Sequence, residues 1–180
     1  MLLLEIPEKE VYDEKNNEFI TINSQVLELE HSLLALSEWE SKWCKPFITK
    51  EPKTYEETID YIKCMTLTPN VDPLVYTFLS NSHIEQVNKY IEAPMTATTF
   101  NSTGKGNANN EYITNELIYY WMVALTIPFE CQTWHLNRLL TLIQVCNLKN
   151  KPPKKMSKRD VMNQNAALNK ARRAQYNAKG

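Results

Sequence analysis

The sequence predicts an α+β fold that is predominantly α: a small N-terminal antiparallel sheet of about three strands, a helical bundle, and a basic C-terminal arm. Three observations lead to this prediction. Residues 1–31 hold short strand-forming runs separated by turns, residues 54–148 hold apolar residues at helical spacing behind capping motifs, and residues 149–180 are strongly basic. We therefore expect one folded body, 1–148, followed by an arm, 149–180.

The expected strands are rich in Leu, Ile, Val, Phe and Thr and lie at 2–6, 18–22 and 26–30. In the last of them Leu27 and Leu29 alternate with glutamates, a period of two that is typical of a sheet with one face in water.

The next segment, 32–45, is compatible with either a strand or a helix. We expect a strand through Leu36 that leads into a short helix at 38–44, with Ser37 and Glu40 as its capping box. Pro46 should end this helix.

Three capping patterns predict helices in the middle of the chain: Thr54 with Glu57, Asp72 before Pro73, and Ser82 with Glu85. The second of these helices should reach about residue 80, and Pro94 should end the third. The inward stripes are expected to be Tyr55, Ile59, Ile62 and Met65 in the first helix, and Ile84, Val87 and Ile91 in the third.

After an exposed loop at 101–111, two more helices are predicted. Thr114 should cap a helix that is apolar nearly all round and therefore sits in the middle of the core. Thr133 should cap the next, whose buried face is Leu136, Leu139, Leu140 and Ile143. We expect the two helices to pair as an antiparallel hairpin around Pro128.

The charges are segregated although the net charge of the chain is only −1. Residues 1–148 carry 20 acidic against 10 basic side chains, whereas residues 149–180 carry 10 basic side chains and a single acid, Asp160. The arm begins with a stiff, solvated Pro-Pro linker and continues as a marginal helix at 157–176 that needs a partner surface to order it.

The composition argues against several classes of protein. The N-terminus has no basic region before Glu5 and no run approaches the ~18 apolar residues of a membrane span, so we expect a cytosolic protein without a membrane partner. The four cysteines are widely spaced and are expected to be small buried residues. With only three glycines the chain cannot build the usual phosphate-binding loops, so no cofactor is expected.

Cys131 and His135 are four residues apart, a spacing that is compatible with a metal site or with a Cys–His nucleophile pair. A metal site needs three or four converging ligands, and the other histidines and thiols lie in separate elements. A Cys–His nucleophile pair needs an orienting group and an oxyanion hole, and no pattern in the sequence indicates either. We therefore predict no metal, no catalytic residue and no enzyme activity.

Three interpretations of the basic arm stay open. It could contact an acidic surface, either on another copy of this chain or on a partner; it could be a solvated tail; or it could neutralise nucleic-acid phosphates. The residues concerned are Lys149, Lys151, Lys154, Lys155, Lys158, Arg159, Lys170, Arg172 and Arg173. The tryptophans and tyrosines lie in the acidic body and favour core and interface packing over a nucleic-acid stacking platform.

Five segments carry a resemblance to a known family. They are LEHS at 29–32, SEWESKWCKPF at 37–47, DPLVY at 72–76, IYYWMVALTIPFECQTWHLNRLLTLI at 118–143 and LNKARR at 168–173. Together they resemble a family from tailed bacteriophages and prophages of Gram-positive hosts, similar to the tail assembly chaperones of long-tailed phages.

The resemblance implies a small, mostly helical, non-enzymatic protein that binds the tape measure protein and promotes tail tube assembly in the host cytoplasm. It also implies that a longer, frameshifted form is common, with the arm as the junction. Our candidate contact surface is an apolar groove between the 114–126 and 133–147 helices, with Tyr120, Trp134, Leu136 and Leu140 as its contact residues.

Two other functions remain as alternatives. The first is a virion structural protein, such as a head–tail connector or a minor capsid or tail component, which would be located in the virion. The second is a regulator that binds nucleic acid through the arm.

Overall fold

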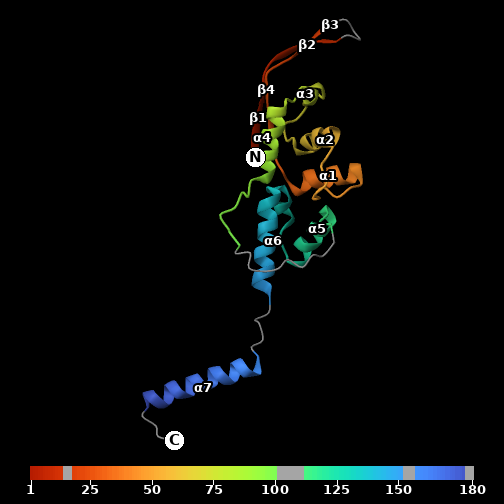
Figure 1. Ribbon diagram of the computed structural model, residues 1–180. Coiled ribbons are helices and arrows are strands. Elements are labelled where there is room, and N and C mark those ends of the chain that lie inside the picture. Colours follow the sequence, from red (N-terminus) through yellow and green to blue (C-terminus); the bar gives the residue numbers. More distant parts are fainter. Residues whose placement is uncertain (14–17, 101–111, 152–156, 177–180) are drawn as a thin grey trace. The chain divides into compact units, whose positions relative to one another are not determined.

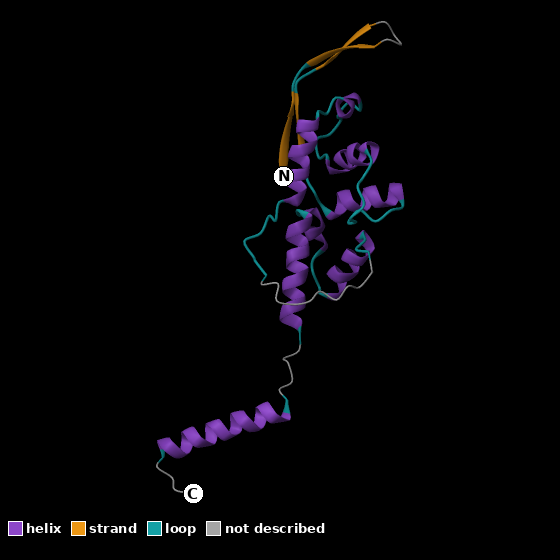
Figure 2. Ribbon diagram, in the orientation of Figure 1, coloured by secondary structure: helices purple, strands orange, loops and turns teal. Residues whose placement is uncertain are grey.

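The computed structural model describes residues 1–13, 18–100, 112–151 and 157–176, and the expected loop at 101–111 falls outside these ranges. The fold is α+β and predominantly α, as predicted. Strand is confined to the N-terminal segment, and the regular elements that follow in the described residues are helical (Figures 1 and 2). The chain divides into two compact units, Met1–Asn147 and Leu148–Gly180.

Four strands form one long antiparallel ribbon instead of a three-stranded sheet. β1 (Leu2–Ile6) pairs with β4 (Gln25–Leu29), and β2 (Lys9–Asp13) pairs with β3 (Glu18–Ile22). Two residues separate β1 from β2 and two separate β3 from β4, so the second ladder continues the register of the first (Figure 1). The break falls at Pro7, which has no N–H to donate to a ladder. β2 was missed because three of its five residues are charged.

The strand expected through Leu36 is wrong, because helix α1 (Leu33–Trp43) already begins at Leu33. Ser32, and not Ser37, is the N-cap, and its hydroxyl accepts a hydrogen bond from the Ala35 N–H at 3.2 Å. The apolar run at 33–36 carried no clear period because it faces two cores. Leu33 and Leu36 pack into one hydrophobic cluster, whereas Ala35 and Trp39 pack into another.

Helix α2 (Tyr55–Met65) begins at the predicted capping box of Thr54 and Glu57. Three of its four predicted inward residues, Ile59, Ile62 and Met65, are buried, but Tyr55 in the first turn is 58% exposed.

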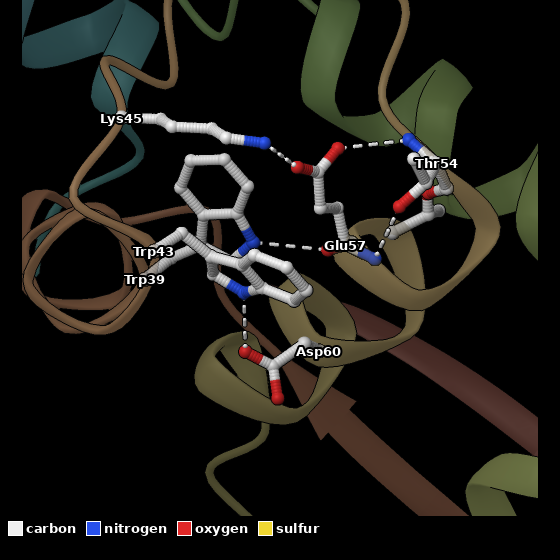
Figure 3. A network of polar contacts seen from close by, with 7 residues as sticks. Trp39, Trp43, Lys45, Thr54, Glu57 and Asp60 are labelled. Atoms are coloured by element: carbon white, nitrogen blue, oxygen red, sulfur yellow. Dashed lines mark hydrogen bonds and ion pairs between the residues drawn. The ribbon is translucent and has the colours of Figure 1, made fainter.

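Polar contacts join α1 to α2 (Figure 3). The indole N–H of Trp39 donates to the Glu57 carbonyl, and that of Trp43 donates to Asp60 Oδ2, both at 2.9 Å. Lys45 forms an ion pair with the Glu57 carboxylate at 2.6 Å, and Lys42 forms one with Asp60. The hydrogen bond from Lys45, aided by the Thr54 N–H, lowers the pKa of Glu57. Burial would raise the pKa of Asp60, but the hydrogen bonds from Lys42 and Trp43 outweigh it and lower the pKa.

Helices α3 (Leu74–Thr77) and α4 (Asn81–Glu92) complete the first cluster. Asp72 accepts a hydrogen bond from the Leu74 N–H at 2.9 Å, but Pro73 and not Asp72 holds the N-cap position, and α3 stops at Thr77, short of residue 80. The α4 capping box is Ser80 with His83, two residues before the predicted one. The first cluster takes its buried residues from β1, β3, β4 and α1 to α4 and the connections between them.

The second cluster joins α1 to α5 (Asn115–Ala124), a 3-10 helix η1 (Phe129–Thr133) and α6 (Leu136–Asn150). The predicted cap at Thr133 is wrong because this residue ends η1; instead, the His135 ring accepts a hydrogen bond from the Asn137 N–H at 3.3 Å. The backbone of α5 approaches α1 more extensively than it approaches α6, which corrects the predicted α5–α6 hairpin. Leu136, Leu139 and Ile143 are buried as predicted.

One buried carboxylate fixes the start of α5. Thr114 holds the N-cap position, but its side chain makes no capping hydrogen bond. Glu40 of α1 acts in its place: one oxygen accepts from the Asn115 N–H at 2.7 Å and the other from the Phe47 N–H at 2.6 Å. Since the side chain is almost fully buried, these two charge-assisted bonds compensate for its desolvation.

A polar seam containing two histidines links the two clusters. His31 shares a 2.5 Å hydrogen bond with the Tyr61 hydroxyl, and its ring lies edge-on to that of His135, with centroids 5.1 Å apart. The His31 carbonyl accepts from the Leu136 N–H at 2.7 Å, and the Asn137 amide donates to carbonyls at the end of α4. Burial and the neighbouring His135 lower the pKa of His31 to about 3. Burial lowers the pKa of His135 as well.

The second unit contains α7 (Lys158–Gln175), close to the predicted 157–176. Every side chain that the structure describes in α7 is exposed, including Val161, Met162 and Leu168.

Candidate partner-binding surface

Helix α5 carries eight consecutive apolar residues, 117–124, which is more than one side of a helix can bury in this fold. Ile118 and Met122, four residues apart, point into the second cluster and are fully buried. Tyr120 and Val123, three residues apart on the opposite side, are 65% and 63% exposed. The helix therefore does not sit in the middle of the core, as its composition predicted, but presents an apolar side outward.

Phe129 of η1 extends this exposed side. Its side chain is 54% exposed, and its ring lies 6.3 Å from that of Tyr119, the neighbour of Tyr120 on α5. Tyr119 is held in place by the hydrogen bond that its hydroxyl donates to Gln132 Oε1 at 3.0 Å. We call Tyr120, Val123 and Phe129 together the α5 outer face.

Two acids border the α5 outer face. Glu116 lies one turn before Tyr120 on the same side of α5, and Glu130 follows Phe129; both are exposed. An apolar strip edged by carboxylates complements an amphipathic helix whose apolar residues are flanked by Lys or Arg.

The structure separates the four contact residues proposed from the sequence. Tyr120 lies on the α5 outer face, but Leu136 is only 2% exposed and belongs to the second cluster. Leu140 is partly buried against that cluster. Trp134 is also partly buried, and the guanidinium of Arg138 lies 4.1 Å from its ring centre. Leu136 is thus unsuitable as a contact residue without unfolding of α6.

Sequence reasoning missed Val123 and Phe129. A usable signal was present in the length of the apolar run: eight consecutive apolar residues on a surface helix leave some of them outside whichever side faces the core.

The arm residues are only partly described. Lys158, Arg159, Arg172 and Arg173 are exposed on α7, whereas Lys154 and Lys155 lie outside the described residues.

The cysteines and histidines are placed differently from the expectation. All four cysteines are free thiols; Cys131 is buried and Cys44 is exposed, which corrects the view that all are buried. Cys131 lies in η1 and His135 just before α6, so the two do not share one helix. Within the described ranges, no three side chains of His, Cys, Asp or Glu gather as metal ligands would.

The largest of the described cavities, about 440 Å³, lies beside the α1–α2 contacts and is lined by Trp39, Lys45, Lys53 and Tyr112 among others. Its lysines are engaged within the chain. Lys45 pairs with Glu57, and Lys53 donates to the Phe47 carbonyl at 2.8 Å while its ammonium lies 4.0 Å from the Phe47 ring centre. Burial lowers the pKa of Lys53.

Comparison of the chain with protein-family models, with curated proteins and with solved structures gave no match. Across the part of the chain that the structure describes, no helix combines the length and the apolar character that crossing a bilayer requires.

Proposed function

We propose that this chain is a non-enzymatic tail assembly chaperone of a tailed bacteriophage, which binds the tape measure protein and promotes tail tube assembly in the host cytoplasm. The sequence resemblance supports the family. The α5 outer face is the observation that supports protein binding, because exposed apolar side chains on α5 (Tyr120 and Val123) and η1 (Phe129) are typical of an interaction site.

The proposed mechanism is non-covalent binding that covers apolar surface. A tape measure protein is a very long helical chain whose apolar faces are exposed until the tube encloses them. A chaperone would cover such a face with the α5 outer face, with Glu116 and Glu130 facing basic residues at its edges. Covering the apolar segments limits aggregation while tube subunits polymerise.

The size of the surface favours a transient contact. Burying the exposed parts of Tyr120, Val123 and Phe129 contributes about 3–5 kcal/mol before the costs of association. That corresponds to weak binding per copy, so several copies along the chain would be needed, and each could be displaced by a tube subunit.

The test is co-expression with a phage tape measure protein. The parent should raise the soluble fraction of that protein, and Tyr120→Glu with Val123→Glu should abolish the effect by placing carboxylates in the apolar strip. Leu67→Glu is the matched control, because Leu67 is 58% exposed but lies outside the α5 outer face. Unchanged solubility with the parent, or equal loss with the control variant, would contradict the proposal.

The arm supports a second candidate, binding of nucleic acid, because its described basic side chains on α7 are all exposed. DNA binding that weakens steeply with salt and disappears on deletion of 149–180 would favour this function. The virion structural alternative is separated by mass spectrometry of purified particles, since an assembly chaperone should be absent from them.

A further inference from the structure

Helix α7 carries an apolar stripe with a basic residue at each end. The helix is uninterrupted over its 18 residues, and its described side chains are exposed (Figure 2). Five of these residues follow one another at alternating spacings of three and four, and they therefore lie along one side of the helix. We call them the α7 stripe: Lys158, Val161, Asn165, Leu168 and Arg172.

The apolar members of the stripe separate two possible uses of this helix. At 3.6 residues per turn, Arg159 and Lys170 fall on the opposite side of α7. A contact with nucleic acid would use the basic side chains but would leave Val161 and Leu168 in water. A surface that is both apolar and acidic would use the whole stripe.

The α5 outer face has the same layout with the opposite charge. Glu116 lies at one end, one turn before Tyr120, and Glu130 follows Phe129 at the other. Both carboxylates are exposed, and neither takes part in an ion pair within the described ranges. The face is therefore acidic at its ends and apolar between them, whereas the α7 stripe is basic at its ends and apolar between them.

We propose that α7 of one copy binds the α5 outer face of a second copy, with the apolar residues of the α7 stripe on that face and its basic ends beside Glu116 and Glu130. Because each copy carries both surfaces, two copies can exchange their α7 helices and close into a twofold dimer. Tyr120, Val123 and Phe129 belong to neither hydrophobic cluster, so the body of each copy folds without this contact.

The dimer itself does not depend on the chaperone function, but one consequence of it rests on that function. In a chaperone, α7 would cover the α5 outer face until an amphipathic helix of the client displaces it. The client and α7 would then compete for one surface, and the chaperone would not expose its own apolar residues while it is unoccupied.

The test is sedimentation equilibrium of the full-length chain, purified free of nucleic acid. The parent should dimerise. Glu116→Lys with Glu130→Lys makes the face basic like α7, and Lys158→Glu with Arg172→Glu makes α7 acidic like the face. Each double variant should associate with itself roughly tenfold more weakly than the parent, or less, since like charges meet at both ends of each contact. A 1:1 mixture of the two variants should form a heterodimer about as tight as the parent, because every basic surface then meets an acidic one.

Two further variants separate charge from position. Arg159→Glu with Lys170→Glu is the matched control, because it changes the charge of α7 by the same amount on the opposite side and should leave the dimer intact. Val161→Asn with Leu168→Asn keeps every charge and should weaken the dimer by removing its apolar contact.

Several results would overturn the proposal: a monomeric parent at its highest soluble concentration, a mixture that does not pair, or an equal loss with the matched control. Association that persists in the Glu116→Lys, Glu130→Lys variant would do so as well, since that variant keeps the basic α7 and would point to nucleic acid. The Lys158→Glu, Arg172→Glu variant leaves the α5 outer face unchanged and should still keep the tape measure protein soluble. A failure of the dimer is therefore distinguishable from a failure of the chaperone function.

Discussion

Acid should destabilise this protein between pH 6.5 and 5, because His31 is held neutral in the folded chain. Its pKa is lowered from 6.5 to about 3 by burial and by the adjacent His135. Below pH 6.5 His31 binds a proton in the unfolded chain but not in the folded chain. The free energy of unfolding is therefore highest above pH 6.5 and decreases as the pH falls below that value. The loss is about 1.4 kcal/mol per pH unit, or about 2 kcal/mol at pH 5 from His31 alone. The lowered pKa of His135 adds a loss of the same sign.

Glu57 and Asp60 do not contribute to the pH dependence of stability between pH 6.5 and 5. The pKa values of Glu57 and Asp60 are lowered from 4.5 and 3.8, so their contribution to stability is lost only as pH falls below those values. Between pH 6.5 and 5 these two carboxylates stay ionised in both the folded and the unfolded chain.

The assay is urea unfolding followed by tryptophan fluorescence, at pH values from about 7.5 down to about 5. His31→Asn removes the titrating ring and should flatten the pH dependence, whatever its effect on stability at neutral pH. Tyr61→Phe removes only the hydroxyl that bonds to His31, and should lower stability by about 1 kcal/mol while keeping the slope. A parent whose stability is level from pH 7.5 to 5, or a His31→Asn variant with the parent's slope, would refute the reasoning.

Three further features, at Glu40, at Cys44 and in the arm, are tested by urea or thermal unfolding. Glu40→Ala leaves the Phe47 and Asn115 N–H groups without their acceptor and should cost about 3 kcal/mol, while Glu40→Gln keeps one acceptor oxygen and should cost about half as much. Cys44→Gly should raise the free energy of unfolding by about 0.5–1 kcal/mol, because Cys44 has a φ of 51°, and Cys44→Ala should bring no such gain. Deleting 149–180 should change the stability of the body by less than about 0.5 kcal/mol, because α7 belongs to a separate compact unit with few large apolar residues; a larger drop would contradict this division.

Local signals in the sequence located several elements well. Thr54 and Glu57 predicted the start of α2 because a capping box is closed within four residues and needs nothing from elsewhere in the chain. The same holds for Asp72 before α3 and for the end of α4 before Pro94. These features depend on neighbouring residues alone.

Features that depend on distant residues were not predictable in the same way. The start of α5 is capped by Glu40, 75 residues away, so no pattern around Thr114 could reveal it. The run at 33–36 was misread because its residues are shared between two cores, which removes the polar side that would mark a helix. The proposed site was affected likewise: Leu136 and Tyr120 are both apolar in sequence, and only the packing of α6 decides that one is inside and the other outside.

Helix α1 supplies a wall to both hydrophobic clusters, with Ala35 and Trp39 on one side and Leu33 and Leu36 on the other. Unfolding of either cluster would remove the contacts on one side of α1 and so destabilise the helix that the other cluster packs against. Two cores that would otherwise open as independent foldons are thereby coupled into one cooperative transition.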